Sequence, residues 1–107
     1  MKYSVEFTAG ARQDLIKIYR YIKNEGRPET AKQLSIQIAQ VCSSLSENPE
    51  RGSIPWELEG LSPSLCRQII HKKMRVIYQI IDQTVLIYGI IDGHRSIREV
   101  MRQRLLV

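Results

Sequence analysis

The residues of this chain that could do chemistry are mostly basic, and they gather towards its C-terminus. Residues 1–63 hold eight Lys or Arg and eight Asp or Glu, whereas residues 64–107 hold eight basic and three acidic residues, so the whole net charge of +5 lies in the second segment. Charge segregated in this way gives one side of a small protein a positive potential that concentrates polyanions. The expected partner is a nucleic acid, a nucleoprotein or an acidic protein segment. The alternative is a solvated basic face without a partner.

The basic residues form two clusters along the chain. One comprises Arg67, His71, Lys72, Lys73 and Arg75, and the other comprises His94, Arg95, Arg98 and Arg102. We expect Arg75 and Arg95 at strand ends, where solvent accepts truncation of either side chain, and beside the Gly-His-Arg turn they would form a phosphate-sized notch. Because Arg95, Arg98 and Arg102 are spaced by three and four residues, their side chains would share one helix face.

Ion pairing within the chain is the alternative use of these arginines. The acids available for it include Glu57, Glu59 and Glu99. Surface ion pairs of this kind are common and would neutralise about half of the arginines.

Metal-independent cleavage of RNA is the reaction that such basic groups could carry out. It needs a base for the 2′-hydroxyl, positive charge for the phosphorane and an acid for the leaving oxygen. His71, Lys73 and His94 are weaker candidates for these roles than the arginines. Metal-dependent cleavage needs clustered carboxylates, and residues 64–107 hold only three acids. The chain has no Gly-rich phosphate loop, nucleophile elbow or His-Glu-x-x-His motif, so we expect neither a metal nor a cofactor.

Cysteine usage and hydropathy indicate a cytoplasmic protein. Cys42 and Cys66 both lie within apolar periodic segments, which favours buried free thiols over a disulfide or a zinc site. Residues 1–7 have no apolar signal-peptide core, and the longest apolar run, residues 85–91, is too short to span a bilayer.

The N-terminal half predicts a strand followed by two helices, within one domain over residues 1–107. Residues 2–7 alternate polar and apolar side chains, as in a strand with one buried face. Thr8 can cap a first helix that ends at Gly26, and Pro28 suits the first turn of a second. The apolar helix positions are Ala11, Leu15, Ile18 and Ile22, then Ala31, Leu34, Ile38, Val41 and Leu45. The short link predicts an antiparallel hairpin.

The C-terminal half predicts a loop, three strands and a helix. Residues 47–64 read as a long loop in which Trp56 and Leu58 have side chains to bury. Strands are expected at about 66–70, 75–81 and 84–91, with Asp82-Gln83 as a tight turn. The Ser96–Glu99 capping box begins a helix whose apolar side is Ile97, Val100, Met101 and Leu105.

The resulting order is β-α-α-β-β-β-α. We expect an α+β fold with a mainly antiparallel four-stranded sheet packed on the N-terminal helical hairpin. The other sheet face would then be free for the C-terminal helix or for a partner.

Several short motifs are spread over the predicted loop, the strands and the turn that follows them. They are Leu45-x-x-x-Pro49-x-x-Gly52, Arg67, Met74-Arg75-Val76-Ile77-Tyr78-Gln79-Ile80, Val85-x-Ile87-x-x-Ile90 and Asp92-Gly93-His94-Arg95. With the order of elements, they make essentially the whole chain resemble the RelE/ParE superfamily of bacterial type II toxins. The resemblance implies a growth-inhibiting toxin encoded beside an antitoxin, which wraps it and masks its active surface.

The resemblance implies one of two activities. RelE-like members cut mRNA in the ribosomal A site with basic residues on the sheet and a tyrosine on or near the last helix. Arg75 and Arg95 match arginines of that branch, and Arg67 stands where it commonly has lysine. Ile69 and Met101 depart from it, because a second basic residue and the tyrosine are expected there. ParE-like members poison DNA gyrase and lack that catalytic set.

We therefore interpret the chain as a ParE-like toxin that inhibits DNA gyrase, which would not be an enzyme, whereas a RelE-like toxin would be an endoribonuclease. A RelE-like endoribonuclease is the first alternative, with His71, Lys73 or His94 replacing missing groups, and a non-catalytic nucleic-acid-binding module is the second. The implied partners are a cognate antitoxin with an acidic amphipathic segment and either gyrase or the ribosome with mRNA, and no membrane. The antitoxin is expected across the sheet and the last helix. Residues expected to bind it or the target are Arg98, Met101, Arg102 and Arg104.

Overall fold

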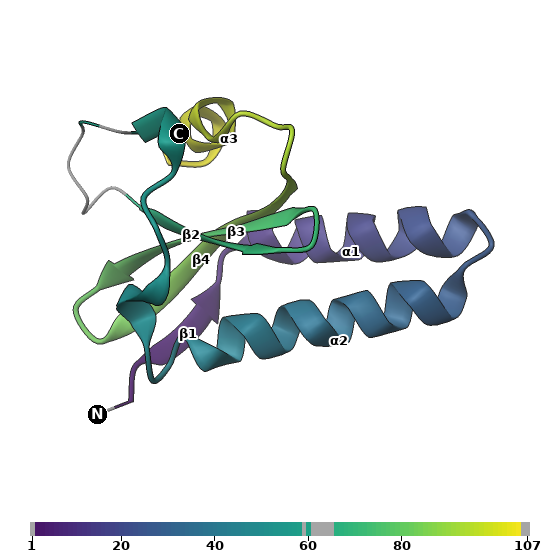
Figure 1. Cartoon of the computed structure of the whole chain (residues 1–107), viewed down its shortest axis with the longest axis horizontal. Coiled ribbons are helices and arrows are strands. Elements are labelled where there is room, and N and C mark those ends of the chain that lie inside the picture. Colours follow the sequence, from purple (N-terminus) through teal and green to yellow (C-terminus); the bar gives the residue numbers. More distant parts are fainter. Residues whose placement is uncertain (1, 59, 61–65, 106–107) are drawn as a thin grey trace.

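A four-stranded sheet lies between a helical hairpin on one face and a short C-terminal helix on the other (Figure 1). The computed structural model describes residues 2–58, 60 and 66–105, without the side chains of Met101 and Leu105. The elements are β1 (Ser4–Phe7), α1 (Ala9–Asn24), α2 (Pro28–Ser44), the short 3₁₀ helices η1 (Pro49–Arg51) and η2 (Trp56–Leu58), β2 (Arg67–His71), β3 (Met74–Ile81), β4 (Thr84–Asp92) and α3 (Ile97–Leu105). This order confirms the predicted α+β arrangement.

The helical hairpin begins and turns where the sequence predicts. The Thr8 hydroxyl accepts a hydrogen bond from the Ala11 amide at 3.1 Å, which caps α1. Gly26 has a φ of +84°, so the chain leaves α1 through the left-handed conformation that glycine tolerates best. Pro28 then opens α2, because its missing N–H has no helical partner at that position.

The sheet has the strand order β1-β4-β3-β2, with β1 parallel to β4 and the other two pairs antiparallel. The prediction of a mainly antiparallel sheet is therefore confirmed. One irregularity interrupts the β3–β4 ladder: Tyr78 pairs with Ile87 and Ile77 pairs with Gly89, so Tyr88 is an extra residue in β4. Such a bulge shifts the alternation of side chains by one position.

Each face of the sheet has its own buried cluster. The hairpin side contains Ala11, Ile38, Cys42, Leu45, Val76, Tyr78, Val85, Ile87 and Ile90. The α3 side contains Leu58, Cys66, Ile77, Ile91, Ile97 and Val100. Ile90 and Ile91 belong to different clusters because successive strand residues point to opposite faces. The C-terminal helix thus covers the sheet face that was predicted to be free for this helix or for a partner.

The loop after α2 is held by the buried hydroxyl of Tyr78. This hydroxyl donates to the Pro49 carbonyl at 2.6 Å and accepts from the Gly52 amide at 3.0 Å. A Cβ at Gly52 would lie 2.7 Å from the Gln68 carbonyl oxygen, closer than packing allows. Three residues of the motif pattern, Pro49, Gly52 and Tyr78, therefore form one packing unit.

The prediction that this loop buries its large apolar side chains is confirmed for Leu58 and wrong for Trp56. Leu58 is buried at 4% exposure, but Trp56 is 52% exposed. The indole stays outside the core because it stacks on the guanidinium of Arg75. The Cζ atom of Arg75 lies 3.8 Å from the centre of the Trp56 ring.

Both cysteines are free and buried, as predicted. Burial raises the pKa of Cys42 to about 12 and that of Cys66 to about 11, so both remain thiols at neutral pH. Among the described residues, no helix is long and apolar enough to cross a membrane.

Replacing Tyr78 with Phe should lower the free energy of unfolding by about 1–3 kcal/mol, because it leaves the Gly52 amide and the Pro49 carbonyl buried without their partner. Tyr88→Phe is the matched control, since that hydroxyl donates to Gln79 in a half-buried place and its loss should cost less than about 1 kcal/mol. Urea unfolding of both variants measures the difference, and equal losses would contradict the role given to Tyr78.

Candidate functional site

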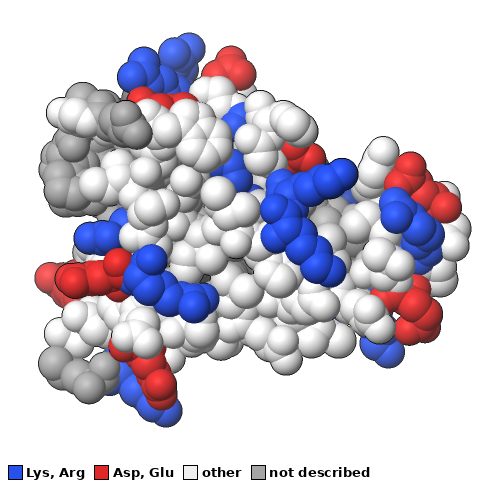
Figure 2. All heavy atoms as spheres, in the orientation of Figure 1, with Lys and Arg blue, Asp and Glu red and all other residues white. Residues whose placement is uncertain are grey.

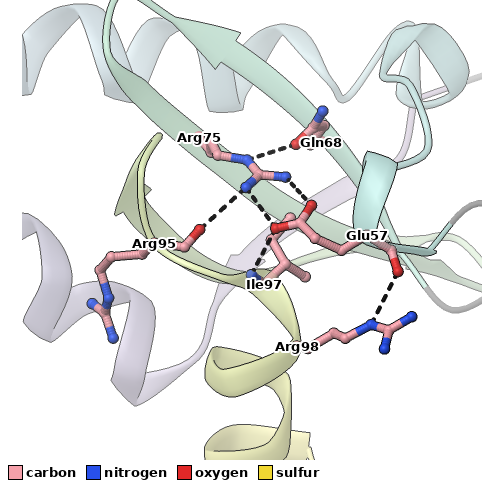
Figure 3. Close-up of polar contacts among 6 residues, drawn as sticks. All are labelled: Glu57, Gln68, Arg75, Arg95, Ile97 and Arg98. Atoms are coloured by element: carbon pink, nitrogen blue, oxygen red, sulfur yellow. Dashed lines mark hydrogen bonds and ion pairs between the residues drawn. The ribbon is translucent and has the colours of Figure 1, made fainter.

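Arg75 is buried beneath η2 and α3, with 1% of its surface exposed. Its two terminal nitrogens donate to the two carboxylate oxygens of Glu57 at 2.9 and 2.7 Å, and its Nε donates to Gln68 Oε1 at 2.8 Å (Figure 3). Nη1 also donates to the Arg95 carbonyl oxygen at 3.3 Å. The prediction of a solvent-exposed Arg75 at a strand end is therefore wrong. The reason is that η2 and α3 cover this end of the sheet.

Glu57 joins the loop to both the sheet and the last helix. Besides its ion pair with Arg75, its Oε2 accepts a hydrogen bond from the Ile97 amide at 3.0 Å, at the first residue of α3 (Figure 3). A carboxylate is favourable there because the helix N-terminus carries partial positive charge. These contacts, the Arg75 side chain foremost, lower the pKa of Glu57 to about 2. The sequence named Glu57 as a pairing acid, but only the fold reveals its two partners.

Arg67 does not join Arg75, although both were expected in one basic site. Gln68 faces Arg75, so its neighbour Arg67 points to the opposite side of the sheet. There, Arg67 Nη1 donates to the carbonyl oxygens of Glu50 and Gly52 at 3.2 and 2.9 Å. Arg67 therefore holds the loop that carries η1.

The weaker candidate His71 also lies away from the Arg75 site. Its Nε2 is 3.0 Å from Gln37 Oε1 of α2, and the residue is half-buried on the hairpin side. His71 therefore bridges the sheet to α2.

The turns that carry the two basic clusters do come together. The Gly93 amide donates to the Lys73 carbonyl oxygen at 2.7 Å, so the β2–β3 turn lies beside the chain that leaves β4. We call the exposed residues Lys72, Lys73, His94 and Arg95 the basic edge. Figure 2 shows Lys and Arg atoms over the β2–β3 turn, in the middle right of that view.

Arg95 and the arginines of α3 do not share one helix face. Arg95 precedes the helix, which begins at Ile97, so the predicted spacing argument holds only for Arg98 and Arg102. The Arg95 side chain points away from Arg75 (Figure 3). Arg98 and Arg102 are exposed on α3, and Arg98 Nε donates to the Glu57 carbonyl oxygen at 3.1 Å.

Arg104 is neutralised by an acid from α1, a partner that the sequence did not identify. Its guanidinium makes a two-point ion pair with Asp14 at 2.6 and 2.7 Å, and Nη1 donates to the Tyr88 carbonyl oxygen at 3.0 Å. The Asp14 hydrogen bond raises the pKa of Arg104 further. Of the residues predicted to bind antitoxin or target, Arg98 and Arg102 therefore remain exposed, whereas the Met101 side chain lies outside the described residues.

The Asp14–Arg104 ion pair also binds backbone groups of β4 beyond the end of β1. β1 pairs with β4 only as far as Phe7 and Ile87, so the Tyr88 carbonyl and the Ile90 amide, which lie beyond that pair, take their partners from side chains. Asp14 Oδ2 accepts from the Ile90 amide at 2.9 Å, and the Tyr88 carbonyl oxygen accepts from both Arg104 Nη1 and the Thr8 hydroxyl, the latter at 3.2 Å. Gly89 leaves room for the guanidinium, because a Cβ there would lie 2.7 Å from Arg104 Nη1.

Two of the three arginines predicted as catalytic, Arg67 and Arg75, bind partners within the fold, on opposite faces of the sheet. In the described ranges, no three His, Cys, Asp or Glu side chains lie close enough together to hold a metal ion. Among the described basic residues of 64–107, the basic edge and the arginines Arg98 and Arg102 of α3 are exposed and can contact anionic groups.

Acid should remove the stabilisation that Glu57 contributes. The pKa of this carboxyl is about 2 in the folded protein against 4.5 ordinarily, so the unfolded chain binds more protons in that range and stability falls as pH drops through it. The full contribution, at most about 3 kcal/mol, is present above that range. Glu57→Gln should be less stable than wild type at neutral pH, and the difference in urea unfolding free energy should shrink towards pH 2. A difference independent of pH would contradict the ion pair.

Removing Arg104 should destabilise the fold, because Asp14 would stay buried without its cation. We expect Arg104→Met to lower the free energy of unfolding by about 3 kcal/mol. Arg102→Met, on the same helix but exposed, should change it by less than about 0.5 kcal/mol. Thermal and urea unfolding measure both, and two equally small effects would show that Arg104 does not anchor α3.

Known structures share this fold at low sequence identity. The chromosomal ParDE system from P. aeruginosa matches with a TM-score of 0.71 and 19% identity, covering 85% of this chain and 96% of that chain. A mutant of E. coli toxin RelE in the free state matches with a TM-score of 0.67 and 20% identity, covering 99% and 97%. The toxin-antitoxin complex RelBE2 from Mycobacterium tuberculosis gives 0.61 and 23%, covering 86% and 92%. These likenesses establish the fold.

The sequence comparisons identify the family. No curated protein matches the chain. The family model described as ParE toxin of type II toxin-antitoxin system, parDE, matches residues 5–97, from within β1 to the first residue of α3. Since this match spans most of the chain and every strand of the sheet, the protein belongs to the ParE toxin family of type II toxin-antitoxin systems.

Proposed function

We propose that this ParE-family toxin stops growth by inhibiting DNA gyrase and is neutralised by a cognate antitoxin with an acidic amphipathic segment. The family match and the fold support the toxin and its antitoxin partner. The target is inferred from which basic residues are exposed and which are paired within the protein.

The burial of Arg75 is the observation that favours gyrase over the ribosome as the target. A cation that stabilises a phosphorane must reach the phosphate, but this guanidinium is 1% exposed and bound on both terminal nitrogens by Glu57. Trp56 covers its face. Cleavage at Arg75 would require η2 and α3 to move and Glu57 to give up its partner. A toxin that acts by binding needs no such rearrangement.

The exposed basic residues are the proposed contacts with the target. Arg95, Arg98 and Arg102 are all exposed, at the start of α3 and along it. Desolvated arginines are frequent hot spots at protein interfaces, because one guanidinium can bind a carboxylate at two points. This surface fits an acidic patch on gyrase or on its complex with DNA.

Ribosome-dependent cleavage of mRNA is the second candidate function. The observation that favours it is the basic edge, where Lys73, His94 and Arg95 lie near one another in exposed positions. Together these groups include an acid–base side chain and two cations, which is the minimum for metal-independent cleavage of RNA.

Two assays on the purified protein test the target. We expect inhibition of gyrase supercoiling and no cleavage of mRNA on ribosomes. The Arg95→Ala/Arg102→Ala variant should inhibit gyrase about 10- to 100-fold less, as expected for the loss of charge-assisted contacts. Lys32→Ala, an exposed cation of α2, is the control and should inhibit like the wild type. Ribosome-dependent cleavage that His94→Ala abolishes would instead establish the nuclease.

A further inference from the structure

Trp56, the only tryptophan of the sequence, is fixed to the fold on one side and open to solvent on the other. One face of its indole lies on the guanidinium of Arg75, whose Cζ atom is 3.8 Å from the ring centre. Since the residue is nevertheless 52% exposed, the exposed area belongs to the opposite face and the edges of the ring. That face is an aromatic surface on which a flat ligand can stack.

The indole is held in place before any ligand binds. The η2 turn that carries it is anchored by Pro55 and Leu58, which are both buried, and the Leu58 amide donates to the Pro55 carbonyl oxygen at 2.9 Å. The guanidinium beneath the ring is itself fixed by Glu57. A preformed aromatic surface of this kind loses little conformational entropy when a ligand binds to it.

Arg98 places a cation beside the indole. Its Nε donates to the carbonyl oxygen of Glu57, the residue that follows Trp56, at 3.1 Å. The terminal nitrogens of Arg98 point away from the Arg75–Glu57 pair (Figure 3), and within the described part of the chain they have no hydrogen-bond or ion-pair partner. The Glu57 carboxylate does not compete for them, because Arg75 binds both of its oxygens. These nitrogens can therefore bind an anion next to the aromatic face.

Ile70 extends the apolar surface on the other side of Arg75. It stands opposite Arg75 in the β2–β3 ladder, so its side chain leaves the sheet on the same face as the guanidinium. Because β2 is an edge strand, this side chain is 55% exposed. An exposed aromatic ring, an exposed aliphatic side chain and an unpaired cation thus surround one buried charge.

We propose that Trp56 is a stacking site for an unpaired base of single-stranded nucleic acid, and that Arg98 binds the phosphate next to that base. A nucleotide carries a flat aromatic ring and an anion one sugar apart, which matches the indole and the guanidinium. Every base has an aromatic face, so the site accepts DNA and RNA strands alike. In a duplex the faces of the bases are covered by their neighbours, and the indole cannot stack on them. This inference goes beyond the proposed inhibition of gyrase and does not depend on it.

The test measures the binding of the purified toxin to labelled oligothymidine, oligouridine and a DNA duplex of the same length. Fluorescence anisotropy gives the affinities, and the emission of Trp56 reports on this site alone because the chain has no other tryptophan. We expect both single strands to bind about tenfold more tightly than the duplex and to quench Trp56. Attraction by charge alone would favour the duplex, since its charge density is higher.

Four variants assign the contacts. Trp56→Leu keeps an apolar cover on Arg75 but removes the stacking face, so it should bind single strands about tenfold more weakly. Trp56→Phe keeps an aromatic face and should stay within about threefold of the wild type. Arg98→Gln should reduce the salt dependence of binding. The control is Tyr21→Leu, the same kind of change at an exposed aromatic residue of α1, and it should bind like the wild type.

Several results would overturn the proposal. They are binding of the duplex at least as tight as that of the single strands, Trp56 emission that does not change at saturation, wild-type affinity in Trp56→Leu, and no binding of either single strand. Loss of gyrase inhibition in Trp56→Leu, with no oligonucleotide bound by the wild type, would instead assign the indole to a protein contact. Urea unfolding verifies that each variant is folded. If Trp56→Leu does not fold, the strand preference and the Trp56 emission of the wild type decide.

Discussion

The ion pair between Arg75 and Glu57 is the contact on which the arrangement of η2, β3 and α3 depends. A guanidinium with 1% exposure is tolerated in a sheet only when a carboxylate neutralises it and its remaining donors are bound. Glu57 meets this requirement and also binds the first amide of α3. One carboxylate therefore fixes the loop, the strand and the helix relative to one another. The exposed residues Arg95 and Arg98 are positioned by their backbone and side-chain contacts with this buried pair.

A second ion pair secures the far end of α3 by the same principle. Asp14 and Arg104 bind the Ile90 amide and the Tyr88 carbonyl, which lie beyond the last residue of β4 that pairs with β1. Folding therefore pairs two of the arginines in residues 64–107 with acids from residues 1–63. Of the described basic residues in 64–107, those that stay exposed lie in the basic edge and on α3.

The residues that reveal the family serve mainly to hold the fold. Pro49, Gly52 and Tyr78 form one packing unit, and Arg67 binds the carbonyl groups of the same loop. Residues that hold a fold do not by themselves reveal what the protein acts on. The toxin family can therefore be identified from the sequence, whereas the target has to be inferred from the exposed side chains.

The sequence by itself determined the elements and their order, because periodicity, capping residues and turn residues act over a few positions. Thr8, Gly26 and Pro28 punctuate the hairpin as predicted, and the predicted strands lie within about two residues of those observed. Only the tertiary structure decided which charges are accessible. Arg75 and Arg95 look alike in the sequence, yet one is buried and the other exposed. That difference arises because burial depends on contacts between residues far apart in the chain, such as Arg75 with Glu57 and Arg104 with Asp14, which local spacing does not encode.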